Sequence, residues 1–131
     1  GLRRAGFAPA EPSVWIWEGV AMYLPLGAVS DALGQITSLA AAGSVLAMTY
    51  RVPHRLPLGA VGRAAIPALF AAAGEPLKST FEPSELASIL GAEWEITYDE
   101  DPTGWRALGT SPAAPARAFL SERLAVATRR P

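Results

Sequence analysis

Residues 13–18 constrain the fold of this chain more than any other stretch. They contain the uncharged run Val-Trp-Ile-Trp and end at Glu18, which Gly19 follows. A continuous run of β-branched and aromatic residues predicts a strand covered on both faces, as in the parallel sheet of an α/β protein. Ligands of open α/β sheets bind beyond the carboxyl ends of the strands. We therefore expect a binding crevice at residues 18–19.

Size and composition narrow the class of protein. At 131 residues, the chain can form one domain with a sizeable core, so we expect a single α/β domain over residues 1–131. The net charge of −1, with scattered basic residues, excludes the basic surface of a nucleic-acid binder. The absence of cysteine and the single histidine argue against disulfides and a metal site.

No uninterrupted apolar run approaches the roughly 18 residues that a membrane span needs. The sequence also lacks the apolar region of a signal peptide at its start. We therefore expect a soluble, cytoplasmic protein with no membrane partner. A chain that begins with glycine and reaches a central-looking strand so early is also expected to be a fragment.

The first half of the chain predicts a strand–helix–strand unit. Leu24 and Pro25 open a helix, which Gly43 is expected to end. The helix has one apolar face, formed by Leu26, Val29, Leu33, Ile36 and Leu39. A second apolar strand follows at residues 44–50, so the two strands should pair in parallel.

The second half predicts two helices and two strands, at residues 58–73, 82–90, 93–98 and 123–128. Pro67 should bend the first of these helices, and Pro83 fits the first turn of the second. Strict alternation predicts that Trp94, Ile96 and Tyr98 share one face of the third strand, beside a solvated acidic face. A long loop with a helical turn separates the two strands. Because no crossover helix is evident there, the final strand should run antiparallel to the third.

Seven short motifs in this order carry a family resemblance: LRRAGF at 2–7, PSVW at 12–15, EG at 18–19, YLP at 23–25, GS at 43–44, GEPL at 74–77 and FEPSEL at 81–86. Together they resemble the C-terminal half of class I S-adenosylmethionine-dependent methyltransferases. More narrowly, they resemble the leucine carboxyl methyltransferase family, which includes polyketide O-methyltransferases.

The resemblance implies a partial doubly wound, Rossmann-like sheet. This chain would supply the strands equivalent to 4, 5, 7 and 6 of that fold, in this spatial order and with the last strand antiparallel. The implied cofactor is S-adenosyl-L-methionine, and the implied reaction is methylation of a carboxyl or hydroxyl oxygen on a small molecule. The glycine-rich cofactor loop belongs to the N-terminal half, which this chain lacks, so we expect it to be inactive alone.

Three residues after the first strand are predicted to bind the cofactor. By the resemblance, Glu18 contacts the methionine portion of the cofactor, although a carboxylate here would equally cap the next helix. Gly19 would allow a close backbone approach, or serve only as a loop glycine. Tyr23 would line the pocket or pack at its rim. No catalytic residue is predicted.

Two residues at the end of the second strand, Tyr50 and Arg51, are predicted to bind the acceptor. Several relatives carry an acid where Arg51 stands, so its fork of donors either binds a carboxylate substrate or pairs with a surface acid. His54 is either a general base or, in the simpler interpretation, part of a solvated loop. Trp15 and Trp17 are expected to be core residues.

A second function fits the same residues. Without the N-terminal half, the edge of the strand at 13–18 has unpaired backbone groups, which favour pairing with another chain. The alternative is therefore a non-catalytic α/β interaction module that forms a homodimer through this edge, or that associates with a separate N-terminal half.

Overall fold

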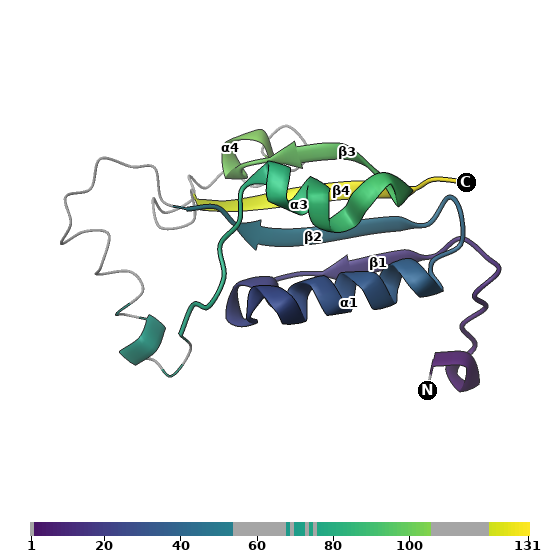
Figure 1. Ribbon diagram of the computed structural model, residues 1–131, viewed down its shortest axis with the longest axis horizontal. Helices are drawn as coiled ribbons and strands as arrows, with labels where there is room; N and C mark the ends of the chain where they lie inside the picture. The colour runs from purple at the N-terminus through teal and green to yellow at the C-terminus, as the bar shows by residue number, and fades with distance from the viewer. Residues whose placement is uncertain (1, 54–67, 69, 73, 75, 106–120) are drawn as a thin grey trace.

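The computed structural model describes residues 2–53, 68, 70–72, 74, 76–105 and 121–131. Within them, a four-stranded mixed sheet forms one layer, and helices α1 and α3 form a second layer on one of its faces (Figure 1). A short 3-10 turn at Leu2–Ala5 precedes β1, and two more, at Ala21–Tyr23 and Gly91–Glu93, lie between longer elements. No helix among the described residues has the length and apolar character needed to cross a bilayer.

The predicted strand–helix–strand unit is present. Its elements are β1 at Val14–Trp17, α1 at Leu26–Leu39 and β2 at Val45–Arg51. Strands β1 and β2 pair in parallel, with Trp15 opposite Leu46. The prediction succeeds because the apolar period changes from a continuous run to a helical spacing and back again.

Helix α1 ends earlier than predicted. Its last turn closes with the N–H of Ala40 donating to the carbonyl of Ile36 at 2.9 Å. Gly43 lies instead in the turn before β2, with a φ of +80° that residues with a Cβ rarely adopt. Its N–H donates to the carbonyl of Arg129 at 2.8 Å. Gly43 therefore positions the start of β2 rather than the end of the helix.

The second half contributes α3 at Pro83–Leu90, β3 at Trp94–Glu100, the helical turn α4 at Pro102–Trp105 and β4 at Glu122–Arg129. The strand order is β1-β2-β4-β3, and β4 runs antiparallel to both of its neighbours (Figure 1). This confirms the predicted spatial order and the antiparallel last strand. Helix α3 begins at a capping box between Glu82 and Glu85, which satisfies backbone N–H groups of its first turn.

The core lies between the sheet and the two helices. Buried residues come from α1, α3 and one face of β2, β4 and β3: Val29, Leu33, Leu86, Leu90, Leu46, Met48, Tyr50, Ala125, Ala127 and Trp94. Thr37 of α1 accepts a hydrogen bond from the indole N–H of Trp94 at 2.8 Å. We call this side of the sheet the helical face.

Strand β1 is not covered on both faces, so that prediction is wrong for the chain as it stands. Trp15 and Trp17 pack against the core, as expected. Val14 and Ile16 point to the opposite side and are 70% and 77% exposed. An apolar strand composition shows that both sides favour burial, but not what covers them. The side of the sheet that carries Val14, Ile16 and, by register, Ala47 is called the open face.

Tyr98 does not share a face with Trp94 and Ile96, which corrects a second prediction. Ile96 pairs with Ala127, but Tyr98 pairs with the next residue, Val126, so a bulge interrupts the register between them. One extra residue in a strand turns every later side chain to the other face. Asp99 therefore lies on the helical face, where a hydrophobic residue was expected.

Two predictions lie largely or wholly outside the described residues. These are the helix expected at 58–73 with its bend at Pro67, and the loop that carries His54.

Candidate functional site

The carboxyl ends of β1 and β2 lie side by side because the two strands are parallel. Glu18 and Gly19 directly follow β1, and Tyr50 and Arg51 are the last residues of β2. The N–H of Gly19 donates to Oγ1 of Thr49 at 2.9 Å, which fastens the turn after β1 to the end of β2. The sheet thus brings the predicted cofactor residues next to the predicted acceptor residues.

Gly19 has a φ of +68°, in the region that favours glycine. A Cβ built at this position would meet no atom within 4 Å. Backbone conformation rather than crowding therefore explains the glycine. The turn that it forms leaves this stretch of backbone open to an approaching group.

The Glu18 carboxylate is exposed and does not cap a helix. Neither the 3-10 turn at Ala21–Tyr23 nor α1 has a side-chain cap, so the capping interpretation is wrong. Within the described part of the chain, no side chain forms a hydrogen bond or ion pair with Glu18. Its charge is available to a cationic group.

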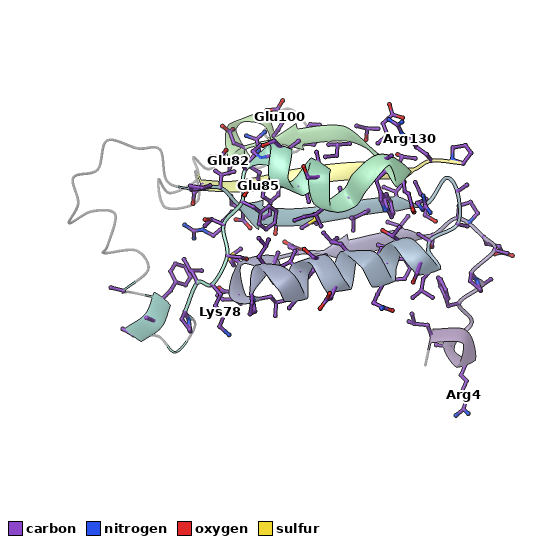
Figure 2. The ribbon with its side chains drawn as sticks, in the orientation of Figure 1. Arg4, Lys78, Glu82, Glu85, Glu100 and Arg130 are labelled. Carbon is purple, nitrogen blue, oxygen red and sulfur yellow. The ribbon has the colours of Figure 1, made fainter. Side chains whose placement is uncertain are left out.

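Tyr23 is half-buried at the end of the 3-10 turn that follows Gly19. The extended segment before α3 holds this turn: the N–H groups of Lys78 and Ser79 donate to the carbonyl of Met22 at 2.8 and 3.2 Å. The Ser79 hydroxyl adds a bond to the carbonyl of Ala21 at 2.9 Å. Figure 2 labels Lys78 on this segment. The turn is thereby fixed from a distant part of the sequence.

Tyr50 is completely buried and uses its hydroxyl within the protein. Its ring stacks on Phe81 with centroids 4.9 Å apart, and its hydroxyl donates to Oδ2 of Asp99 at 2.7 Å. Burial and the bond to Asp99 raise the pKa of Tyr50 above its ordinary value. Arg123 completes the group, with its Nε donating to Oδ1 of Asp99 at 2.7 Å. This network supports the end of β2 from the helical face.

Arg51 lies on the other face of the sheet and is 8% exposed. One terminal amino group donates to the hydroxyl of Ser121 at 2.7 Å, whereas the Nε has no hydrogen-bond partner. The guanidinium lies 5.9 Å from the ring centroid of Phe70. Burial lowers the pKa of Arg51, and the neighbouring Glu122 carboxylate and Tyr23 phenol partly oppose that shift. Tyr23 is therefore an electrostatic neighbour of Arg51.

Sequence reasoning missed Asp99, Arg123 and Ser121. Asp99 looked like part of a solvated acidic run because the bulge that turns it inward leaves no pattern in the sequence. Ser121 is 70 residues from Arg51 and becomes its neighbour only through the pairing of β2 with β4. The one usable signal was that an isolated arginine ends an otherwise apolar strand.

Glu18 supplies an exposed carboxylate and Arg51 a buried guanidinium, both at the carboxyl ends of the parallel strands β1 and β2. Among the described residues, no group of three or more His, Asp or Glu side chains could hold a metal ion. The arrangement suits the binding and orientation of ligands that carry charges of both signs.

Comparison with known sequences identifies a family model and several proteins that are similar to this chain. The family model described as leucine carboxyl methyltransferase matches residues 1–37. A relative from Frankia alni is 33% identical over 104 residues, which cover 79% of this chain and 29% of the relative. Another from Mycolicibacterium gilvum is 33% identical over 115 residues, covering 86% and 34%. Both are named "Putative S-adenosyl-L-methionine-dependent methyltransferase".

Solved structures show the same fold. A "putative methyltransferase" from Thermobifida fusca YX superimposes with a TM-score of 0.71 and 20% identity, covering 98% of this chain and 47% of the other. A DUF574-family protein from Streptomyces avermitilis gives a TM-score of 0.65 and 16% identity, covering 98% and 48%.

The open, mixed four-stranded sheet is an α/β fold similar to that of the solved methyltransferase structures. The curated relatives confirm the resemblance to S-adenosylmethionine-dependent methyltransferases, and the leucine carboxyl methyltransferase model matches residues 1–37 of the chain. The chain spans about a third or less of the length of those relatives, and about half of the solved structures.

Proposed function

We propose that this chain is the C-terminal part of an S-adenosylmethionine-dependent O-methyltransferase that acts on a carboxyl or hydroxyl oxygen of a small molecule. The observation that carries the proposal is the corner after β1. Glu18 stands there unpaired by any described residue, at the ligand edge of a methyltransferase-type sheet.

The chemistry of this corner fits the proposed cofactor. S-adenosylmethionine carries an ammonium group and supplies a methyl group activated by a sulfonium. The exposed Glu18 carboxylate would bind the ammonium, because opposite charges attract in a partly dehydrated crevice. The turn at Gly19 would leave room for the ligand, and Tyr23 would form part of the pocket wall.

The acceptor would lie towards the end of β2. Arg51 would bind it directly, whereas Tyr50 would contribute as a rigid support, since its hydroxyl is already bonded to Asp99. Methyl transfer needs the two reactants held in line and close together, which can supply much of the reduction in the barrier. This role of the protein requires positioning and no nucleophilic side chain.

Calorimetry with S-adenosylhomocysteine tests the proposal. Residues 1–131 alone should bind the ligand weakly or not at all. A longer chain that joins them to the N-terminal part of the Frankia alni relative should bind it. In this longer chain, Glu18→Gln should weaken binding about tenfold, which corresponds to the loss of one charged contact. The exposed Glu11→Gln should leave the affinity unchanged.

The proposal fails if the longer chain folds but does not bind S-adenosylhomocysteine. It also loses its basis at Glu18 if the Glu18→Gln and Glu11→Gln variants bind equally well.

A second candidate function, a homodimeric interaction module, is favoured by the exposure of Val14 and Ile16 on an edge strand. Within Val14–Trp17 there is no charge, proline or bulge of the kind that blocks edge pairing. Two copies would then pair along β1.

Light scattering at increasing protein concentration distinguishes this candidate. A homodimer should appear in the parent chain and disappear in Ile16→Lys, with the circular dichroism of the fold retained. A parent chain that stays monomeric at high concentration argues against the module.

A further inference from the structure

We infer that Thr49 and Ser79 are positioning residues for the segment that follows β1. Their buried hydroxyl groups hold residues 18–24, here called the corner segment, in the conformation that would receive the amino-acid end of the cofactor. The identity of this ligand rests on the proposed function. The positioning itself follows from hydrogen bonds within the chain.

The corner segment has few hydrogen bonds of its own. It contains the 3-10 turn Ala21–Tyr23, which has no side-chain cap. The N–H groups of Tyr23 and Leu24 donate to the carbonyls three residues before them, at 3.0 and 3.2 Å. A turn this short is unstable in isolation, because too few bonds offset the cost of ordering its backbone. Its conformation therefore depends on groups elsewhere in the chain.

Thr49 and Ser79 supply these outside contacts. Oγ1 of Thr49 accepts the N–H of Gly19 at 2.9 Å, and the hydroxyl of Ser79 donates to the carbonyl of Ala21, also at 2.9 Å. Both residues are only 8% exposed, so water competes little for either bond. The corner segment is thus held at two points, one from β2 and one from the segment before α3.

Both hydroxyl groups belong to backbone that is itself fixed. Thr49 lies in β2, which has a neighbouring strand on each side. Ser79 lies two residues before Phe81, whose N–H donates to the carbonyl of Arg51 at 2.9 Å and whose ring stacks on Tyr50. A rigid support reduces the conformational freedom that a binding site loses when its ligand arrives.

These residues would act through Glu18 and not by touching the ligand. Each hydroxyl is buried and already bonded to the corner segment, whereas Glu18 is exposed and directly precedes Gly19. The direction of the Glu18 side chain depends on the backbone of this turn. Since a charged contact weakens with distance, a displaced turn would weaken the binding of a cationic group.

Hydrogen exchange of the ¹⁵N-labelled chain, followed by NMR, tests whether the corner segment is held as one unit. Each variant is judged at an amide that the lost hydroxyl does not touch. Exchange of the Gly19 amide should rise about fivefold in Ser79→Ala, and that of the Leu24 amide about fivefold in Thr49→Val, the usual effect of losing one hydrogen bond. If Thr49→Val does not fold, Ser79→Ala still decides the matter.

Calorimetry of the longer chain then tests what this order does for a ligand. S-adenosylhomocysteine is compared with 5′-methylthioadenosine, which keeps the adenosine and the sulfur but lacks the amino-acid end. Ser79→Ala and Thr49→Val should each weaken S-adenosylhomocysteine binding about fivefold. Binding of 5′-methylthioadenosine should not change, because it has no group for Glu18 to hold. A general loss of structure would weaken both ligands alike.

The chain offers rescue variants and matched controls. Ser79→Thr and Thr49→Ser keep the hydroxyl group, so each should restore exchange and affinity towards the parent values. Ser88→Ala and Thr97→Val remove hydroxyls that donate to backbone carbonyls at 2.9 and 3.2 Å on exposed parts of α3 and β3. These two controls should leave the corner segment and both affinities unchanged.

Three results would overturn the inference. The first is exchange at Gly19 and Leu24 that does not respond to the loss of the distant hydroxyl. The second is an unchanged affinity for S-adenosylhomocysteine in Ser79→Ala and Thr49→Val, and the third is an equal loss for both ligands. Each would leave the proposed function standing if the longer chain binds S-adenosylhomocysteine. A longer chain that binds neither ligand would refute the proposed function, and the exchange rates alone would then decide whether the two hydroxyls hold the corner segment.

Discussion

At the scale of single residues, Tyr50 on β2 and Tyr98 on β3 differ in whether the buried side chain forms a hydrogen bond through its hydroxyl group. Tyr50 donates to the Asp99 carboxylate at 2.7 Å. The hydroxyl of Tyr98 is buried and has no hydrogen-bond partner. The bulge in β3 explains both, because it turns Asp99 towards Tyr50 and moves Tyr98 to the open face.

Tyr50→Phe should therefore lower the free energy of unfolding by roughly 1.5–3 kcal/mol, the usual effect of losing a hydrogen bond to a charged group. Tyr98→Phe is the matched control, and we expect no loss of stability because no bond is removed. Urea unfolding followed by circular dichroism measures both. Equal losses in the two variants would show that the Asp99 bond is not the source of the effect.

The dependence of stability on alkaline pH tests the same hydrogen-bond network of Tyr50, Asp99 and Arg123. The pKa of Tyr50 is raised in the folded state, chiefly by burial, whereas an unfolded tyrosine titrates at about pH 10. Between pH 10 and the folded value, only the unfolded chain loses this proton. Tyr50 thus makes its full contribution to the free energy of unfolding below pH 10. This contribution is lost as the pH rises further, by up to about 1.4 kcal/mol per pH unit.

Urea unfolding between pH 8 and 11.5 checks this sign. The parent chain should lose stability above pH 10 more steeply than Tyr50→Phe. If the free energy of unfolding falls equally with pH in the two proteins, the loss does not come from Tyr50.

At the scale of elements, the two faces of the sheet should respond differently to mutation. Leu46→Ala on the helical face, where the parent side chain is 1% exposed, should cost roughly 2–5 kcal/mol. Ile16→Thr on the open face, where the parent is 77% exposed, should change stability by less than about 0.5 kcal/mol. Thermal and urea unfolding at low protein concentration provide the comparison. A large loss for Ile16→Thr would mean that another surface covers β1.

Most elements could be predicted from the sequence because their signals are local. The apolar face of α1, Pro83 at the start of α3 and the alternation that begins at Trp94 each fall within a few residues. The coverage of β1 and the bulge before Tyr98 could not, since both depend on neighbouring strands that a single segment does not reveal.

The candidate site, like the fold, could be predicted from the sequence only in part. Glu18, Gly19, Tyr50 and Arg51 could be placed together because parallel strands end at one edge. The partners of Tyr50 and Arg51 could not be predicted. Asp99 is 49 residues from Tyr50 and Ser121 is 70 residues from Arg51 in the sequence, and each pair is brought together only by the pairing of strands in the sheet.

At the scale of the whole molecule, the sheet should be most stable at its centre. Strands β2 and β4 each have a neighbour on both sides, whereas β1 lies at an edge. Hydrogen exchange should therefore be slowest at Val45–Arg51 and Glu122–Arg129, and faster at Val14–Trp17. Mass spectrometry of peptic fragments measures these rates. Protection of β1 equal to that of β2 would contradict an uncovered edge.

The place of β4 in the sheet also has a consequence for biosynthesis. Residues 122–129 are made after the other three strands that the structure describes, yet they lie between β2 and β3 and bond to both (Figure 1). While the ribosome is still translating the preceding segment, β2 and β3 have no strand between them. The sheet can close only after β4 has emerged, so a premature stop codon before residue 122 would remove its centre rather than its margin.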